Sequence, residues 1–86
     1  MHVSDTVASA RLDGVVAALL SISRERAKEM VLGGLVELDY ETCERTDKIL
    51  VPPSVITVRG FGKFRVNSLC DKTKKGRLRL DADKYV

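Results

Sequence analysis

The chain is 86 residues long, 44% hydrophobic and 31% charged, and has a formal net charge of +3. A chain of this size forms one domain with a modest core, and it has little room for a deep active site. No apolar run approaches the roughly 18 residues that a membrane-spanning helix needs, so we expect no membrane partner.

Two short helices are predicted after a polar lead, residues 1–8, which we expect to be flexible. The first helix has Ser9 available as its N-cap, and its apolar stripe at helical spacing consists of Leu12, Val15, Val16, Leu19 and Leu20. The second is predicted to begin after Ser23, its N-cap, and to end at Gly33 and Gly34. Its buried side consists of Ala27, Met30 and Val31.

After the second helix the apolar period changes to two, which is typical of strands. Alternation at Val36 and Leu38 predicts the first strand, and two more are predicted over Ile49–Val51 and Val55–Arg59. The two prolines between the latter cannot donate to a sheet and mark a turn or an edge. The sequence therefore predicts an α+β fold in which two N-terminal helices pack on a small antiparallel sheet.

A basic hairpin is predicted at the C-terminal end. Eight of the fifteen Lys and Arg residues lie between Arg59 and Arg79, with Asp71 the one acid among them. Basic and apolar residues alternate on both sides of the turn Asp71–Gly76, so the basic residues of the two runs should share an exposed face. That face would carry Lys63, Arg65, Arg77 and Arg79, with Lys72, Lys74 and Lys75 at the tip. Such a surface suits phosphate groups, although surface strands also carry Lys and Arg for solubility and to protect their edges.

A second, smaller basic group lies on the predicted helices and consists of Arg11, Arg24, Arg26 and Lys28. Arg24 and Lys28 are four residues apart, so they share one helix face. Ser23 and the exposed amides at the start of the second helix are further candidates for binding a phosphate. Glu25 and Glu29 leave a plainer alternative open, in which the same cations form ion pairs within the helix.

Catalysis and metal binding are not predicted. The chain has one histidine, His2, no Ser-His-Asp or Cys-His set, and no glycine-rich phosphate loop. Cys43 and Cys70 lack the spacing of a zinc site, so we expect no cofactor. We interpret both as buried free thiols in a reducing compartment, with a disulfide as the alternative in a secreted protein. Asp81 and Asp83 fit solvated counter-charges better than catalytic carboxylates.

The chain resembles a known RNA-binding family. The domain named after ribosomal small-subunit protein four, the S-four or alpha-L domain, is similar in order and spacing to Arg11-Leu12-Asp13, Ser23-Arg24 with Ala27, and Gly34 with Val36 and Leu38. This resemblance covers residues 9–59. The C-terminal part of the YlmH-type proteins of bacteria and plastids is similar to the continuation, Val58-Arg59-Gly60-Phe61-Gly62-Lys63-Phe64 and Lys74-Lys75-Gly76-Arg77.

The resemblance implies a two-helix face and an adjoining hairpin that dock on structured RNA, ribosomal or transfer RNA, through its backbone and shape. The residues that match RNA-facing positions are Arg11, Ser23, Arg24 and Arg26, whereas Asp13 belongs to the structural part of the motif and braces Arg11 or the helix start. YlmH-type proteins act at the large ribosomal subunit, and the full protein has an N-terminal region that is absent here.

The sequence departs from the family pattern in the first hairpin. Leu35 and Glu37 stand where the family often has Lys or Arg, and Asp39 stands for its usual Asn. Pro53-Ser54 replace the customary Gly-Asp turn. We therefore expect weak binding by this hairpin and a larger share of the contact from the basic hairpin.

We predict a non-enzymatic, monomeric RNA-binding module of a longer protein, located in the bacterial cytoplasm or a plastid. It would form one domain over residues 9–86, with a motif core at 9–59 and a hairpin extension at 60–86. Phosphate contacts are expected from Arg11, Ser23, Arg24, Arg26, Lys28, Arg59, Lys63, Arg65, Lys72, Lys74, Lys75, Arg77 and Arg79. Tyr40 and Phe61 are candidates for stacking one base each.

Two alternatives stay open: an accessory domain of an RNA-modifying enzyme, and a protein-interaction module that uses Leu35 and Phe61.

Overall fold

The computed structural model describes residues 1–70 and 75–85. Within this part the chain forms β1 (His2–Val7), α1 (Leu12–Leu20), α2 (Arg24–Leu32), β2 (Val36–Leu38), β3 (Glu41–Thr42), β4 (Ser54–Val58), β5 (Gly62–Cys70) and β6 (Leu78–Lys84). The predicted α+β class is confirmed. Neither described helix is long and apolar enough to cross a membrane.

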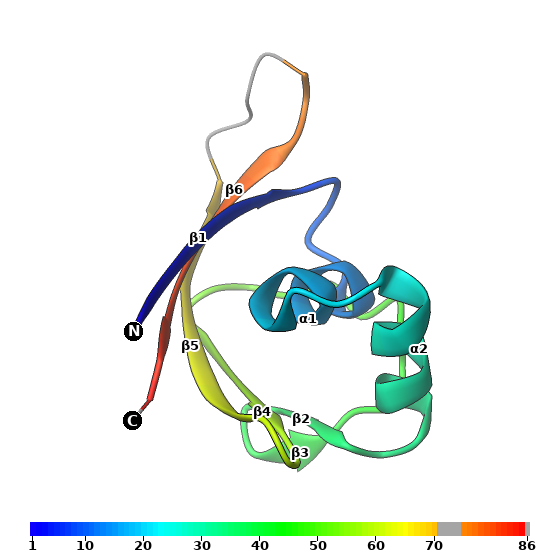
Figure 1. The fold of residues 1–86 in the computed structure, drawn as a ribbon. Coiled ribbons are helices and arrows are strands. Elements are labelled where there is room, and N and C mark those ends of the chain that lie inside the picture. Colours follow the sequence, from blue (N-terminus) through cyan, green and yellow to red (C-terminus); the bar gives the residue numbers. More distant parts are fainter. Residues whose placement is uncertain (71–74, 86) are drawn as a thin grey trace.

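The strands form one antiparallel sheet in the order β1-β6-β5-β4-β2-β3. Both helices pack on the same side of this curved sheet, and its other side is not covered by a helix in the described part of the chain (Figure 1). The start of β1 and the end of β6 lie near each other because these two strands pair antiparallel, with His2 opposite Asp83. The sheet therefore has an inner face toward the helices and an outer face toward solvent.

The core lies between the helices and the inner face of the sheet. The predicted stripe of α1 is buried at four of its five positions, with Leu20 half-buried. The buried residues of α2 are those predicted, Ala27, Met30 and Val31. From the sheet they meet Val36, Ile56, Val58, Phe64, Val66, Leu80 and Ala82. Each such large side chain stabilises the fold by about 1.5–3 kcal/mol, so packing fixes which sheet face the helices cover.

The ends of α2 follow the prediction, whereas the start of α1 does not. The Ser23 hydroxyl accepts a hydrogen bond from the Arg26 amide at 3.1 Å, and Gly34 ends the helix with a φ of +77°. The N-cap of α1 is Arg11 and not Ser9, and its side chain forms no capping hydrogen bond. Carbonyl groups of the loop before β4 accept from the first α1 amides instead, with Leu12 N donating to Lys48 O at 2.8 Å. A side-chain cap is therefore not required there.

The predicted flexible lead at residues 1–8 is wrong for His2–Val7, which forms β1. This strand pairs with β6 from His2 opposite Asp83 to Val7 opposite Leu78. Val7 is buried in the core, so the strand is held by packing as well as by backbone hydrogen bonds. Without β1, strand β6 would leave an unpaired edge on the sheet.

Another strand prediction also fails. Residues 49–51 form no strand, and Ile49 makes only an isolated bridge with Arg11. The predicted C-terminal hairpin is confirmed as the pair β5–β6, which contains a bulge between Val66 and Ser68.

Replacing Val7 by Ala tests whether β1 is a packed strand. We expect Val7→Ala to lower the free energy of unfolding by about 1–2 kcal/mol, because it removes buried methyl groups. Ser4→Ala, in the same strand but exposed, should change it by less than about 0.5 kcal/mol. Urea unfolding monitored by circular dichroism measures both. Equal, negligible effects would mean that the lead is not packed on the domain.

Candidate functional site

A buried carboxylate joins the starts of the two helices. Asp13, in the first turn of α1, has a side chain with no solvent exposure. Its Oδ1 accepts from the Gly14 amide at 2.7 Å, and its two oxygens accept from Arg11 Nε and Nη2 at 3.3 and 3.2 Å. Arg24 Nη2, from the first residue of α2, lies 3.4 Å from Asp13 Oδ1. One carboxylate therefore positions the two arginines at the helix starts.

The surroundings of Asp13 favour its charged form. Burial by itself raises the pKa of Asp13, but the hydrogen bonds from Gly14, Arg11 and Arg24 and the charge of Arg24 outweigh it. The net effect lowers the pKa of Asp13 below its usual value of 3.8. Asp13 therefore stays ionised at neutral pH, and the site keeps one negative charge between two positive ones.

The two arginines remain accessible to a ligand. The side chains of Arg11 and Arg24 are 37% and 45% exposed, although both contact Asp13. A guanidinium carries five N–H donors in a planar fork, so donors remain after the contact with Asp13. Such a pair suits a phosphate or a carboxylate. The structure thus confirms the predicted bracing role of Asp13 and extends it to Arg24.

The other predicted residues of α2 do not all lie on one side. Arg24 and Lys28 share a face, whereas Arg26 is rotated about 160° from each of them. Arg26 is exposed and Lys28 half-buried. In the described part of the chain neither has an acidic partner within ion-pair distance, so the alternative of intrahelical pairs with Glu25 and Glu29 is not realised for them. Ser23 is exposed, and its oxygen already caps the helix.

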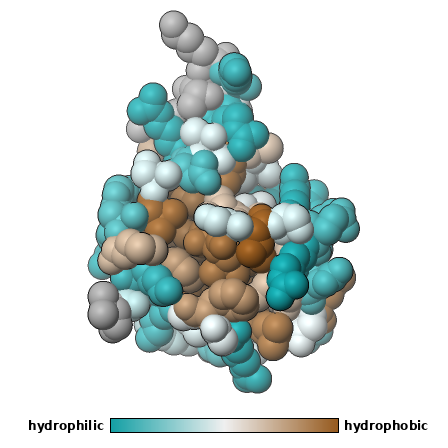
Figure 2. Space-filling view, viewed as in Figure 1, coloured by the Kyte–Doolittle hydropathy of each residue, from teal (hydrophilic) through white to brown (hydrophobic). Residues whose placement is uncertain are grey.

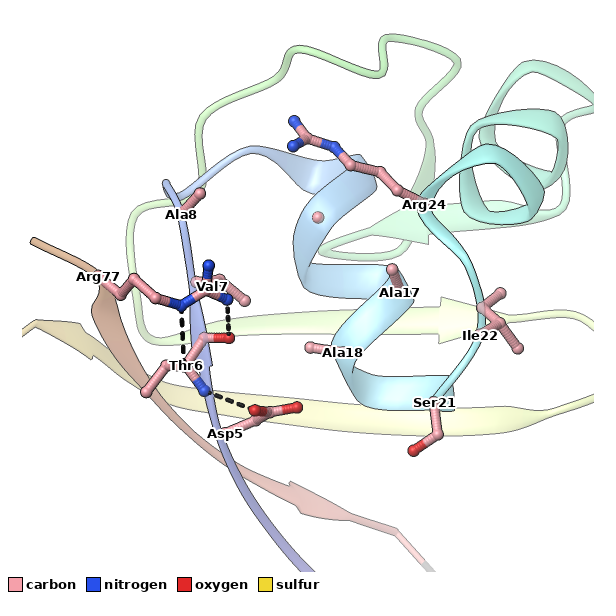
Figure 3. A pocket seen from close by; sticks show the side chains of 11 residues that line it. Asp5, Thr6, Val7, Ala8, Ala17, Ala18, Ser21, Ile22, Arg24 and Arg77 are labelled. Carbon is pink, nitrogen blue, oxygen red and sulfur yellow. Dashed lines mark hydrogen bonds between the residues drawn. The ribbon is translucent and has the colours of Figure 1, made fainter. Parts of the chain in front are cut away.

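A groove lies between β1 and the helices and has a volume of about 520 Å³. Its walls come from the end of β1, from the α1 residues Gly14, Ala17 and Ala18, and from the turn between the helices. Arg24 and Arg77 lie at its rim, one from the helical side and one from the sheet side (Figure 3). Apolar surface is also prominent in the middle of the face shown in Figure 2, with hydrophilic residues around it. The groove combines small apolar side chains with two guanidinium groups.

The position of Arg77 corrects the predicted hairpin face. Arg77 precedes β6, and its Nε donates to Thr6 Oγ1 at 3.0 Å and its Nη2 to Thr6 O at 2.9 Å. Contact with β1 therefore turns Arg77 toward the groove and away from Lys63 and Arg65. The structure brings Arg77 to the same groove as Arg24, a residue of the helical group.

The outer face of the sheet carries three described cations of the two long strands, but it is not strongly basic. Lys84, at the end of β6, is instead opposite the inward-facing Phe64, and its Nζ lies 5.8 Å from the centroid of that ring. Lys63, Arg65 and Arg79 lie on the outer face by strand alternation. The sheet register puts three carboxylates on the same face: Glu37, Asp81 and Asp83. Asp83 lies directly opposite Arg65. Among the described residues, these three cations and three acids balance, which supports the interpretation of Asp81 and Asp83 as counter-charges.

Lys63 lies between two exposed tyrosines at one end of this outer face. Its Nζ is 5.1 Å from the ring centroid of Tyr40 and 5.5 Å from that of Tyr85. Both distances are typical of cation–π contacts, which hold the ammonium group over the rings. Tyr40, a predicted stacking residue, therefore already has a cation as its neighbour.

The other predicted site residues are scattered. Arg59 and Phe61 are exposed near the β4–β5 turn, where the Arg59 amide donates to Leu35 O at 2.9 Å. Lys75 is exposed near the β5–β6 turn, and Lys72 and Lys74 lie outside the described residues.

Both cysteines are free thiols. Cys43 is half-buried and Cys70 is exposed, so the expectation that both are buried is wrong.

The residues that β1 contributes to the groove are not among those predicted from the sequence. Asp5 and Thr6 line it, and Thr6 is the partner of Arg77. The signal available in the sequence was weak: Val3 and Val7 have strand spacing, but Asp5 lies between them on the same side.

Comparison with known proteins gives two informative matches, while no family model matches the chain. The chain is 34% identical over 76 residues to the ribosome-associated protein quality control protein P2 of Bacillus subtilis. This match covers 88% of the chain but only 30% of that relative. The structure of 30S ribosomal protein S4e from Thermoplasma acidophilum superposes with a TM-score of 0.57 and 24% identity, over 96% of this chain and 38% of that one. The chain therefore has an S4-like fold and is related to part of a ribosome-associated quality-control protein.

Replacing Asp13 by Asn tests the buried carboxylate. Asp13→Asn should lower the free energy of unfolding at pH 7 by about 1–3 kcal/mol, because both arginines lose a charged acceptor. Since the folded-state pKa of Asp13 is lowered, its contribution is present above the unfolded pKa near 4 and is lost as pH falls through the folded value. The difference between wild type and variant should therefore shrink below about pH 4.

Urea unfolding across this pH range measures the effect. Asp47→Asn is the control, because Asp47 is exposed and its contact with Arg45 spans 3.6 Å. This control should change the free energy of unfolding by less than about 1 kcal/mol. A loss at pH 7 that is equal in both variants would contradict a special role for Asp13.

Proposed function

We propose that this chain is a non-enzymatic RNA-binding module that docks on structured RNA, ribosomal or transfer RNA, as part of a ribosome-associated protein. The helical face binds the phosphate backbone through Arg11, Arg24 and Lys28, and Arg77 adds positive charge from the sheet side. The large ribosomal subunit is the proposed partner. The observation that carries the proposal is the arginine pair that Asp13 holds at the adjoining starts of α1 and α2.

Fixed arginines favour recognition of RNA by shape. A guanidinium held by a buried carboxylate loses less conformational entropy on binding than a freely rotating one, so its donors are presented in one arrangement. Two such groups would therefore respond to the arrangement of phosphates in a folded RNA and not to the identity of its bases. Phosphate contacts position a protein on nucleic acid but carry no sequence information directly.

The comparisons support the same proposal. The Bacillus relative is described as ribosome-associated, and the solved structure with the same fold is a protein of the 30S subunit. The chain spans less than a third of the relative. We therefore propose the ribosome-associated role for a longer protein in which this chain is the RNA-binding module.

The outer face is assigned a secondary role. Lys63, Arg65 and Arg79 lie on the side of the sheet opposite the helices and share it with three carboxylates, so this face offers little net attraction to RNA. A rigid RNA helix that contacts the helical face would not reach it. Arg26, on the other side of α2, would add contacts only where the RNA curves around the domain.

Binding to structured RNA should depend on Arg24. We expect Arg24→Ala to weaken binding to a ribosomal RNA fragment or to transfer RNA about tenfold, because a charged hydrogen bond to phosphate is lost. The slope of log affinity against log salt should become less negative by about 1. Fluorescence anisotropy at several salt concentrations, with unstructured RNA and duplex DNA for comparison, measures both.

Arg45→Ala is the matched control, since it removes the same charge from an exposed loop arginine. It should change the affinity by less than about twofold. Circular dichroism establishes that both variants are folded. Equal binding of every polyanion, unchanged in Arg24→Ala, would overturn the proposal.

The two faces can be compared directly. Lys63→Ala and Arg65→Ala should each weaken binding to structured RNA by no more than about twofold, because outer-face cations are balanced by acids and point away from the helices. The same anisotropy titrations measure this. A loss as large as that of Arg24→Ala would instead identify the outer face as the main RNA-binding surface.

A further inference from the structure

We propose that the groove between β1 and the helices receives one unpaired nucleotide of the bound RNA, whose base carries an exocyclic amino group. This inference rests on the proposed function and adds a specific subsite to it. The base would lie against α1, its amino group would donate to Asp5, and its flanking phosphate would contact Arg24. The domain would then recognise a structured RNA in which a single base is turned out of the helix.

The size and walls of the groove fit one base. Its volume of about 520 Å³ lies in the range of small-ligand sites, which is about 300–1,000 Å³. Ala17 and Ala18, both half-buried, expose only methyl groups along one wall, and Ile22 continues that wall. Small side chains leave room for a flat ring to approach the helix. No aromatic residue lines the groove in the described part of the chain, so the base would be held by apolar contact and not by stacking.

Polar groups at the rim fit the edge of a base that donates. The Asp5 carboxylate points toward α1 from β1, and its Oδ1 accepts from the Thr6 amide at 2.7 Å (Figure 3). Its Oδ2 has no hydrogen-bond partner among the described residues. A carboxylate only accepts, and the single ring donor of uracil, N3–H, lies between two carbonyl oxygens that repel a carboxylate. Asp5 therefore favours adenine, cytosine or guanine, which carry amino groups, over uracil.

The turn between the helices adds a second polar group. Ser21 ends α1 with a φ of +54°, a conformation that favours glycine. A serine at this position retains a hydroxyl on the groove wall that glycine would lack.

The charge at the rim fits a phosphate next to the inserted base. Arg24 contacts Asp13 through Nη2 alone in the described residues, which leaves donors on Nε and Nη1. Figure 3 shows its side chain extending along the rim from the start of α2. Arg77 contributes its charge at the opposite side, while Thr6 fixes its position. A ligand with a flat apolar ring, a donor group and an adjacent anion satisfies all these features, and a nucleotide within RNA has each of them.

Three hairpin RNAs that differ at one position test the proposal by fluorescence anisotropy. One has a single bulged adenosine in its stem, one a bulged uridine, and one an uninterrupted stem. The wild-type chain should bind the bulged adenosine about fivefold more tightly than the uninterrupted stem. The bulged uridine should gain less than about twofold, and Asp5→Asn, whose amide can donate to uracil, should remove the preference for adenosine. Equal affinity for all three RNAs would overturn the proposal.

Filling the groove provides a separate test. Ala18→Leu should abolish the preference for the bulged adenosine while the uninterrupted stem binds as before, because Ala18 carries no charge and takes no part in the phosphate contacts. Ser4→Leu adds the same side chain on the exposed outer face and should keep the preference. A preference that survives in a folded Ala18→Leu variant would exclude the groove as its origin.

A spectroscopic readout reports on insertion without relying on affinity. The bulged adenosine is replaced by 2-aminopurine, whose fluorescence rises when the base leaves the stack of its neighbours. Binding of the wild type and of Ser4→Leu should raise the fluorescence, and binding of Ala18→Leu should not. No rise with the wild type, together with preserved binding of structured over unstructured RNA, would overturn the nucleotide site but leave the proposed function intact. Loss of that wider preference would overturn both.

Discussion

The buried carboxylate of Asp13 is the interaction on which the candidate site depends. A charge without solvent contact is unfavourable unless it is paired and hydrogen-bonded, and here one amide and two guanidinium groups fulfil that requirement. The need is mutual, because Arg11 and Arg24 gain fixed positions from the same carboxylate. As the three residues come from the starts of α1 and α2, the electrostatic requirement also sets how the helices meet. The guanidinium groups of Arg11 and Arg24 are thus held in a defined geometry and retain little conformational freedom.

Strand β1 extends this two-helix unit toward the sheet. It completes the edge next to β6, contributes Val7 to the core and forms one wall of the groove. Thr6 of the same strand holds Arg77, so a residue of the C-terminal hairpin faces the helices. The groove therefore exists only where three regions distant in sequence meet. Its apolar wall and charged rim arise from α1 on one side and from arginines of α2 and the hairpin on the other.

The sheet divides the basic residues of the chain between two environments. On the inner side, Arg11, Arg24 and Arg77 lie near the helix starts or the groove and have a buried or backbone partner. On the outer side, Arg65 lies opposite Asp83, and Lys63 lies over two tyrosine rings. A count of cations along the sequence treats both groups alike, but neighbouring acids lower the attraction of the outer face for a polyanion. The asymmetry explains why the helical face is the better candidate for RNA.

The sequence by itself determined the helices, the cap at Ser23, the end of α2 at Gly34, the pairing of the C-terminal hairpin and the α+β class. These features follow from apolar periodicity and local backbone preferences, which neighbouring residues specify. The tertiary structure alone decided that His2–Val7 is a strand, that loop carbonyls replace Ser9 at the start of α1, and that Arg77 turns to Thr6. Each of these depends on a partner more than 30 residues away, as Arg77 and Thr6 are 71 positions apart. Local sequence patterns do not specify such a partner, because the two residues come into contact only when the sheet forms and the core packs.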